Sequence, residues 1–370
     1  MFTERPRARA LRLLRDTVAG PLAAGQPLPP ERELAELCQV SRTTLRWALN
    51  QLADEGVLRL AGARTRLVAD PRARPTIASN AIYLFSSIEL GGGGPHRAMA
   101  DGHNGGWGES IHLGALQGLR SHGRPVLIPG SGIPDEATVA ALLRERPLGV
   151  LMPEAMLSGV TDERLTRAAV RLTAAGIPTV VYGEFPDRCD RVCSDHEAGA
   201  YALSQWLIQR GCRRQLCLWM GPCTQPWAQR RRAGHERALR EAGCPILPIA
   251  WVRWHHDPAA PDELAITVAG HLAPYLLSAE PLDAIVAMTD GQLPEIYAAL
   301  RRCGREPGRD ITVVGYDGYW QGLSEPPAAT VDKRNYEMGK AMATLLEARI
   351  AGDLPPEPQE CQIAPLLVTL

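Results

Sequence analysis

The sequence of 370 residues lacks the marks of a membrane or exported protein. Its N-terminus, MFTERPRARALRLL, has apolar letters interrupted by Arg, which predicts no signal peptide, and no later apolar run approaches a membrane span. The nine cysteines lie without paired spacing, so we expect reduced thiols and a cytoplasmic protein. The remaining composition, with 45% hydrophobic and 22% charged residues, is ordinary for a soluble globular protein.

Several chemical motifs are missing as well. There is no GxxxxGK[ST] phosphate loop, and neither CDRVC at 189–193 nor the histidine pair at 255–256 has a second ligand pair at zinc spacing. Ser194, Asp195 and His196 are neighbours in sequence, whereas a catalytic triad is an arrangement in space. Asp195 precedes a helix, which is more typical of an N-cap than of a ligand. The sequence therefore predicts no metal and no cofactor.

Charge is divided unevenly along the chain, although the formal net charge is only −1. Residues 1–74 carry 13 Arg against 8 acidic residues, whereas the remainder carries 27 basic and 33 acidic residues. A basic head on an acidic body predicts that only the head meets a polyanion. At this length we expect two or three domains.

The stretch CQVSRTTLRWALNQLADEG (38–56) predicts one helix with two faces. Its apolar stripe recurs at helical spacing and consists of Leu45, Ala48, Leu49 and Leu52. Thr43, Arg46 and Asn50 point the other way, Ser41 is a good N-cap, and Gly56 is a good stop.

The surrounding pattern is helix, helix, helix and hairpin. Residues 9–19 are amphipathic, LPPERELAEL begins a second helix, and strands at 57–60 and 65–68 flank an AGAR tip. One helix of such a unit fits the major groove, where Arg reaches guanine O6 and N7, and the hairpin lies along the backbone as a wing. The alternative is a small helical bundle with a solvated Arg face.

Beyond a Pro- and Arg-rich linker at 69–79, short apolar runs alternate with amphipathic helical stretches. The runs are AIYLF, PVLIP, LGVLMP, IPTVVY, QLCLWM, ILPIAW, DAIVAM and ITVVGY. This alternation predicts an α/β region with parallel sheets, and its length favours two lobes in series. Open α/β sheets bind ligands at the carboxyl ends of their strands, so two facing lobes would form a cleft.

The segment LPPERELAELCQVSRTTLRWALNQLADEGVLRLAGARTRLV resembles the winged helix-turn-helix of the GntR family over nearly its whole length. The preceding VAGPLAAGQPLPP resembles that family's lead-in. The resemblance implies DNA contacts at Arg32, Ser41, Arg42, Thr43, Arg46, Gly62 and Arg64. Trp47 stands where the family usually has a glutamate, and we expect it to pack against a neighbouring domain.

The segments PLDAIVAMTDGQLPEIYAALRRCGREPGRDITVVGYDGYW and PPAATVDKRNYEMGKAMATLLEARIAG resemble the effector domain of LacI-type repressors, which is itself similar to periplasmic sugar-binding proteins. A GntR-type head on a LacI-type body is the arrangement of bacterial arabinose repressors. The resemblance implies a small N-terminal winged helix (1–68), a linker (69–79) and a two-lobed periplasmic-binding-protein-like domain (80–370).

The same resemblance implies a ligand site. It places ligand contacts at Asp317 after the GYD strand, Asp290, Arg231 and Trp107, with Thr289 standing where relatives have Asn. Carboxylates and Arg suit paired hydroxyl groups, and a Trp face suits the C–H side of a sugar ring. Weaker candidates are Trp227, Trp254, Tyr182 and Glu184, and each Trp has the alternative of ordinary core packing.

These observations predict a transcription regulator, a repressor of a sugar-utilisation operon, and not an enzyme. We expect it to bind double-stranded operator DNA as a homodimer and to respond to a small sugar-like effector, with no membrane partner. The rival interpretation is a sugar-modifying or hydrolytic enzyme with an accessory basic domain, using Asp290 and Asp317 as its carboxylates. A transport-type binding protein is a third, disfavoured by the missing signal peptide.

Overall fold

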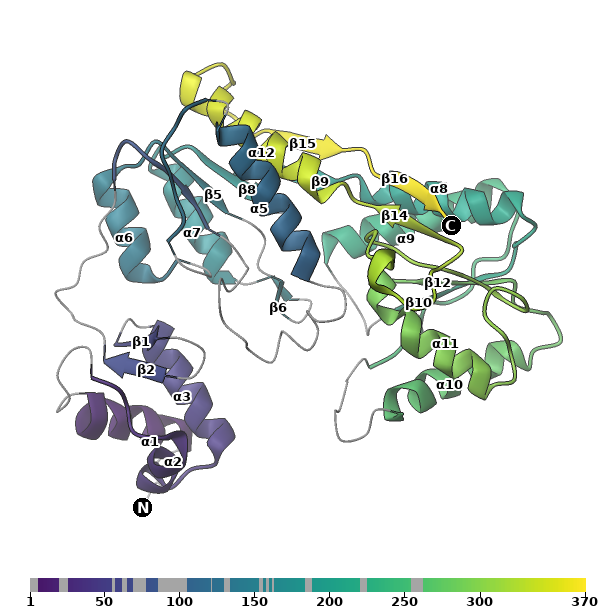
Figure 1. Ribbon diagram of the computed structural model, residues 1–370, viewed down its shortest axis with the longest axis horizontal. Helices are drawn as coiled ribbons and strands as arrows, with labels where there is room; N and C mark the ends of the chain where they lie inside the picture. The colour runs from purple at the N-terminus through teal and green to yellow at the C-terminus, as the bar shows by residue number, and fades with distance from the viewer. Residues whose placement is uncertain are drawn as a thin grey trace.

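Three helices and a hairpin form the N-terminal part of the chain (Figure 1). In the computed structural model these elements are α1 Pro6–Leu13, a π-helical turn Leu14–Ala19, α2 Glu31–Cys38, α3 Arg42–Asp54, β1 Leu58–Ala61 and β2 Thr65–Val68. The structure describes residues 6–19, 26–54, 57–61, 65–68, 78–85, 105–120, 122–129, 134–152, 156–157, 160–161, 163–183, 188–219, 225–253 and 262–370.

The helix α3 follows the pattern predicted for it. Its four stripe residues are buried in one core with residues of α1, α2 and the hairpin. The Ser41 hydroxyl accepts the backbone N–H of Thr44 at 3.2 Å, which confirms Ser41 as the N-cap. The antiparallel pairing of the two strands, with Leu58 opposite Val68, confirms the predicted hairpin. The predicted stop at Gly56 lies outside the described residues.

A parallel sheet with the strand order β15-β9-β8-β5-β3-β4 forms the first lobe. Its elements are β3 Ile82–Leu84, α5 Gly105–Arg120, β4 Val126–Leu127, α6 Glu136–Glu145, β5 Gly149–Met152, the small hairpin β6 Met156–Leu157 and β7 Val160–Thr161, α7 Glu163–Ala174, β8 Thr179–Tyr182, β9 Asp190–Ser194, α12 Asn335–Ala351 and β15 Glu360–Ile363. Helices α5 and α12 pack on one face of the sheet, and α6 and α7 pack on the other.

A second parallel sheet, of order β11-β10-β12-β13, forms the other lobe. Its elements are α8 His196–Gln209, β10 Gln215–Trp219, α9 Pro226–Glu241, β11 Ala250–Trp251, α10 Glu263–Leu276, β12 Ala284–Ala287, a 3₁₀ turn Asp290–Gln292, α11 Leu293–Arg302, β13 Thr312–Val314, a second 3₁₀ turn Trp320–Gly322, β14 Ala329–Asp332 and β16 Leu366–Thr369. Helices α8 and α9 cover one face of this sheet, and α10 and α11 cover the other. Across the two lobes, each of the eight predicted apolar runs contains a strand.

The chain passes between the two lobes three times (Figure 1). The first passage joins β9 to α8, the second joins β14 to α12, and the third joins β15 to β16. At the first passage the Asp195 carboxylate accepts the Ala198 N–H at 2.9 Å, which confirms the predicted N-cap. These passages place residues from distant parts of the sequence side by side where the lobes meet.

Glycines bring the backbones of paired helices into contact. A side-chain carbon on Gly339 of α12 would overlap the carbonyl oxygen of Ile111 in α5, and one on Gly234 of α9 would overlap that of Glu197 in α8. Each helix that follows a passage is therefore seated tightly on a helix of the lobe that it enters.

None of the helices in the described part of the chain is both long and apolar enough to cross a membrane. Eight of the nine cysteines fall in the described ranges, and all eight are free thiols.

Candidate functional site

The face of α3 opposite its buried stripe is polar and exposed. Arg42, Thr43, Arg46 and Asn50 all lie on the surface, as does the capping residue Ser41. On α2, the exposed Arg32 has its Nε 4.0 Å from a carboxylate oxygen of Glu36. The structure thus brings five of the seven predicted DNA contacts to the surface of the head, while Gly62 and Arg64 lie outside the described residues.

Arg46 does not project alone from this face. Its Nε donates to Oε2 of Glu31 at 2.9 Å, and Arg66 of β2 donates from Nη1 to Oε1 of the same carboxylate at 3.1 Å. The other terminal nitrogen of Arg66 donates to Oδ1 of Asn50 at 2.8 Å. One carboxylate at the start of α2 therefore connects α3 to the wing.

Trp47 corrects one expectation. Its ring packs against the core of the head itself, and the Arg7 guanidinium carbon lies 4.9 Å from the ring centroid. Trp47 is thus partly buried against the core of its own domain, where packing removes apolar surface of the ring from water.

In the second lobe, Asp317 lies between two cations. Its Oδ1 accepts from Nη2 of Arg231 at 2.8 Å and lies 3.2 Å from Nζ of Lys333. Asp317 follows β13, Arg231 comes from α9, and Lys333 stands at the passage from β14 to α12. The Asp317 side chain is 13% exposed and those of Arg231 and Lys333 are 6% and 11% exposed, so the cluster is almost fully desolvated.

Arg231 is held on every side. Its Nη1 donates to the carbonyl oxygen of Met288 at 2.6 Å, and its Nε donates to Nδ1 of His196 at 3.3 Å. The guanidinium carbon lies 3.6 Å from the centroid of the Tyr316 ring and 4.7 Å from that of Trp227. Stacking on two rings fixes the plane of the guanidinium and therefore the direction from which it meets Asp317.

The charges of this cluster shift the pKa values of its members. Burial alone would raise the pKa of Asp317, but Lys333 and Arg231 outweigh it and hold that pKa well below its usual range. Burial, reinforced by Arg231 and Lys333, lowers the pKa of His196 well below its usual value. At neutral pH the site therefore holds an ionised Asp317 beside a neutral His196.

Asp290 is close to this cluster but faces the protein interior. It is 0% exposed, and its carboxylate accepts from the Thr330 hydroxyl at 2.8 Å and from the Tyr319 N–H at 2.7 Å. A side-chain carbon on Gly315 would overlap it. Burial raises the pKa of Asp290 to about 7. This carboxylate is thus in position to fix the loop after β13, which carries Asp317, and its own oxygens are already used.

The other predicted ligand residues are divided between the lobes. Trp227 is 8% exposed, and its Nε1 is buried without a hydrogen-bond partner among the described residues. Tyr182 ends β8 of the first lobe, and its phenol contributes, after burial and Asp317, to raising the pKa of Tyr319 in the second. Trp107 lies in α5 but its side chain is outside the described set, and Glu184 and Trp254 lie outside the described residues.

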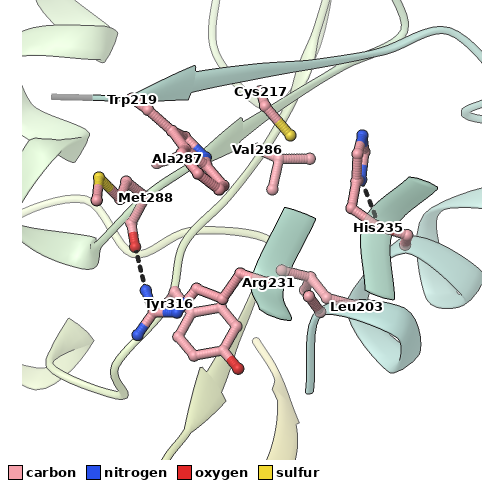
Figure 2. Close-up of a pocket in the computed structure, with 11 residues that line it drawn as sticks. Leu203, Cys217, Trp219, Arg231, His235, Val286, Ala287, Met288 and Tyr316 are labelled. Carbon is pink, nitrogen blue, oxygen red and sulfur yellow. Dashed lines mark hydrogen bonds between the residues drawn. The ribbon is translucent and has the colours of Figure 1, made fainter. Parts of the chain in front are cut away.

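Behind Arg231 lies a cavity of about 20 Å³, room for about one water molecule (Figure 2). Its walls come from α8, α9, β10 and β12, and they include Tyr316 and His235. Nδ1 of His235 is hydrogen-bonded to the Ser204 hydroxyl at 2.7 Å, and burial lowers the pKa of His235 to about 4. This cavity is too small for an effector and belongs to the packing behind the site.

Sequence reasoning did not find Lys333, His196, Tyr319 or Asn335. The Asn335 amide donates to the Tyr319 hydroxyl at 2.9 Å, while its Oδ1 is buried without a hydrogen-bond partner in the described part of the chain. All four residues follow a strand directly or by a few positions, at a passage between lobes or at the edge of the sheet. Tyr319 follows the apolar run ITVVGY, which was the available signal, whereas His196, Lys333 and Asn335 follow β9 and β14, which are not among the apolar runs named above.

Within the described ranges, no three His, Cys, Asp or Glu side chains gather as a metal site would require. Of the sequence neighbours Ser194, Asp195 and His196, the last two have partners elsewhere in the protein. Asp195 caps α8, and His196 accepts a hydrogen bond from Arg231.

Two protein families match the chain in series. The family of bacterial regulatory proteins named gntR matches residues 9–66, and the periplasmic binding protein-like domain matches residues 205–369. The chain is 30% identical over 233 residues to the HTH-type transcriptional regulator CelR of Thermobifida fusca, which covers 60% of this chain and 63% of that protein. It is 30% identical over 172 residues to the ribose operon repressor of Bacillus subtilis (strain 168), which covers 46% of this chain and 49% of that protein.

The chain thus spans between about half and just under two thirds of these curated relatives. Solved structures show the same fold. A complex of the transcriptional regulator CelR with cellobiose has a TM-score of 0.59 at 21% identity and covers 92% of this chain and 98% of that one. A LacI family regulator from Enterococcus faecium with bound ribose has a TM-score of 0.55 at 17% identity, covering 78% and 96%. The chain therefore carries, in series, a segment that matches the gntR family of bacterial regulatory proteins and a segment that matches the periplasmic binding protein-like domain.

Proposed function

We propose that the protein is a cytoplasmic transcription regulator that represses a sugar-utilisation operon. Its head (1–68) binds operator DNA as part of a homodimer, and its two-lobed domain (80–370) binds a small hydroxylated effector. One observation carries the proposal: a capped helix with an exposed Arg–Thr–Asn face shares a chain with a desolvated Asp–Arg–Lys cluster where two lobes meet. One related protein is named a ribose operon repressor and the structure of another is a complex with cellobiose, which supports a sugar as effector.

The chemistry of the cluster suits vicinal hydroxyl groups. An ionised carboxylate accepts from a hydroxyl, while Arg231 and Lys333 donate to one, so neighbouring hydroxyls can be bound in pairs. The orphaned Nε1 of Trp227 and Oδ1 of Asn335 offer one more donor and one more acceptor. A hydroxylated ligand would satisfy both groups, and their unmet hydrogen bonds would add to its affinity.

The passages between lobes offer a route from effector to DNA. Lys333 and Asn335 lie on the passage that enters α12 of the first lobe, whereas Asp317 and Arg231 belong to the second. A ligand bound across them would favour one relative orientation of the lobes, and hence one spacing of the two heads in a dimer. Coupling of about 1–3 kcal/mol changes operator occupancy by about 5–150-fold.

The site geometry weighs against the enzyme interpretation. A glycosidase needs one carboxyl that can donate a proton and a second that is open to the substrate. Asp317 has a lowered pKa and is bound to two cations, so it is a poor acid. The pKa of Asp290 is raised to about 7, as a general acid needs, but its carboxyl is fully buried and bonded to Tyr319 and Thr330, so it is not open to a substrate.

The proposal is tested with full-length protein in two steps. Selection from a random duplex library should yield a two-fold symmetric site, and the dimer should bind it far more tightly than random DNA at moderate salt. A thermal-shift screen of monosaccharides and disaccharides should then find a ligand that changes the affinity for the selected duplex. Equal affinity for selected and random DNA would refute the proposal, and turnover of a glycoside panel would favour the enzyme.

A further inference from the structure

The carboxylate of Glu31 stands at the junction of the three parts of the head that surround the DNA-reading face. Each of its two oxygens accepts a hydrogen bond from a different arginine. Oε2 accepts from Nε of Arg46 on α3, and Oε1 accepts from Nη1 of Arg66 on the wing strand β2. The side chain of Arg66 is 17% exposed, that of Glu31 35%, and that of Arg46 64%. The network is therefore anchored on its inner side and open on the side of Arg46.

The bonds to Glu31 persist at neutral pH. Burial would raise the pKa of Glu31, but the hydrogen bonds and charges of Arg46 and Arg66 lower it below its usual value. Arg66 is fixed in turn, because its Nη2 donates to Asn50 on the same face of α3. An ionised Glu31 thus holds Arg46 by a charge-assisted hydrogen bond to a rigid partner.

Glu31 binds Arg46 through Nε and not through a terminal nitrogen of the guanidinium group. Arg reads a guanine by donating two hydrogen bonds to O6 and N7, and its two terminal nitrogens can make that pair while Nε bonds elsewhere. Within the described residues, Nε is the nitrogen of Arg46 that has a hydrogen-bond partner. The bond to Glu31 therefore restricts the side chain and leaves its terminal nitrogens available for a base.

We propose that Glu31 is a positioning residue for base reading: it orients Arg46 before DNA arrives and so converts a basic contact into a sequence-specific one. The inference rests on the proposed function of the head. An arginine that is already ordered loses less rotamer freedom on binding, and it meets one base edge rather than any nearby phosphate. A carboxylate beside the DNA also repels phosphates, so its contribution lies in specificity and not in total affinity.

Loss of the carboxylate should therefore lower base specificity but raise total affinity for DNA. This combination distinguishes a positioning role from a structural one. Glu31→Gln removes the charge but retains the size of the side chain. It should raise affinity for random DNA, because one negative charge near the phosphates is lost. It should also lower discrimination at the base pair read by Arg46. Loss of a structural contact would instead weaken binding to every duplex in parallel and lower the melting temperature of the head.

The matched control is Glu33→Gln. Glu33 lies in the same first turn of α2 and is exposed, and it makes no ion pair with Arg46. This substitution changes the net charge of the head by the same amount without touching the network. It should raise affinity for random DNA to a similar or smaller extent and leave base discrimination unchanged.

The experiment uses the full-length protein and a duplex selected from a random library, together with its single-base-pair variants and a random duplex, in fluorescence-anisotropy titrations. The base pair read by Arg46 is the one at which Arg46→Ala loses discrimination, by about 5–100-fold for one bidentate contact. Glu31→Gln should lose about 3–10-fold at that same base pair, a part of the same contact. In the Arg46→Ala background, Glu31→Gln should cause no further loss, since it acts through Arg46.

Full discrimination by Glu31→Gln, or losses that multiply in the double variant, would overturn the positioning role. If the wild type itself fails to distinguish the selected duplex from random DNA, the proposed function fails instead. The two failures are therefore separate results.

Discussion

Replacing Asp317 by Asn tests the charge balance of the proposed effector site most directly. Asn retains the shape of the side chain, and it tolerates the left-handed backbone at this position, where φ is 95°. The amide oxygen can still accept from one cation, but Arg231 and Lys333 lose the negative charge between them. Because both cations are nearly buried, water cannot replace that charge.

The magnitude follows from the burial of the pair. Removing one partner of a buried ion pair costs about 3–5 kcal/mol, and we expect the lower end, about 3 kcal/mol, because one hydrogen bond is retained. In a urea titration followed by tryptophan fluorescence, the unfolding midpoint should fall by about 1–2 M. Asp262→Asn is the control, since Asp262 is 79% exposed and its ion pair with Arg302 should contribute at most about 1 kcal/mol.

The pH dependence of the same difference provides a second check. Asp317 has a lowered pKa in the folded protein, so its stabilisation is complete above the unfolded value and is lost as pH falls through the folded one. The stability difference between wild type and Asp317→Asn should therefore stay constant from pH 8 to pH 5 and shrink below about pH 4. Operator affinity should be retained and the response to effector lost. An unfolding midpoint equal to that of Asp262→Asn would refute the charge balance inferred for this site.

Three further substitutions probe packing, burial and capping. Gly339→Ala should destabilise the first lobe by about 1–3 kcal/mol in the same urea titration, because the new methyl group overlaps the backbone of Ile111. The neutral, buried His235 favours the folded state above pH 6.5, and this contribution is lost as pH falls towards 4; it amounts to about 3 kcal/mol at about 1.4 kcal/mol per pKa unit. His235→Asn, which can still bond Ser204, should thus lose less stability than wild type between pH 7 and pH 4, and parallel curves would show that His235 does not titrate there. Ser41→Ala should cost the head about 1 kcal/mol in thermal unfolding, and an unchanged melting temperature would mean that the cap is not stabilising.

The elements of the fold were predictable because their signals are local. The eight apolar runs each contain a strand, and the residues of α3 lie on one buried and one exposed face, as their spacing predicts. Asp195 behaved as an N-cap because capping depends only on the next three residues. Such features need no knowledge of the rest of the chain.

The candidate effector site was only partly predictable because it depends on contacts between distant segments. Asp317 and Arg231 were expected at the site, but Lys333 was not, since its proximity to Asp317 follows from the passage between β14 and α12. Asp290 was also expected at the site. A carboxylate after a strand can face a cleft or the interior, and the bonds of Asp290 to Thr330 and Tyr319 hold it in the interior. Glu31 and Arg66 lie 35 residues apart and meet only in the folded head.

The two C-terminal strands, β15 and β16, pair with strands from earlier in the chain, and this affects the order in which the protein folds during synthesis. The sheet of the first lobe is completed by β15, at residues 360–363, although its neighbour β9 ends at Ser194. β14 likewise waits for β16, at residues 366–369. All residues of the head core come from the first 68 residues of the chain, which are synthesised first. The head can therefore fold while the lobes still lack strands. Under the proposed function, DNA-binding capacity can thus arise on the nascent chain before any effector site exists to control it. The outer edge of β9 stays unpaired until β15 emerges.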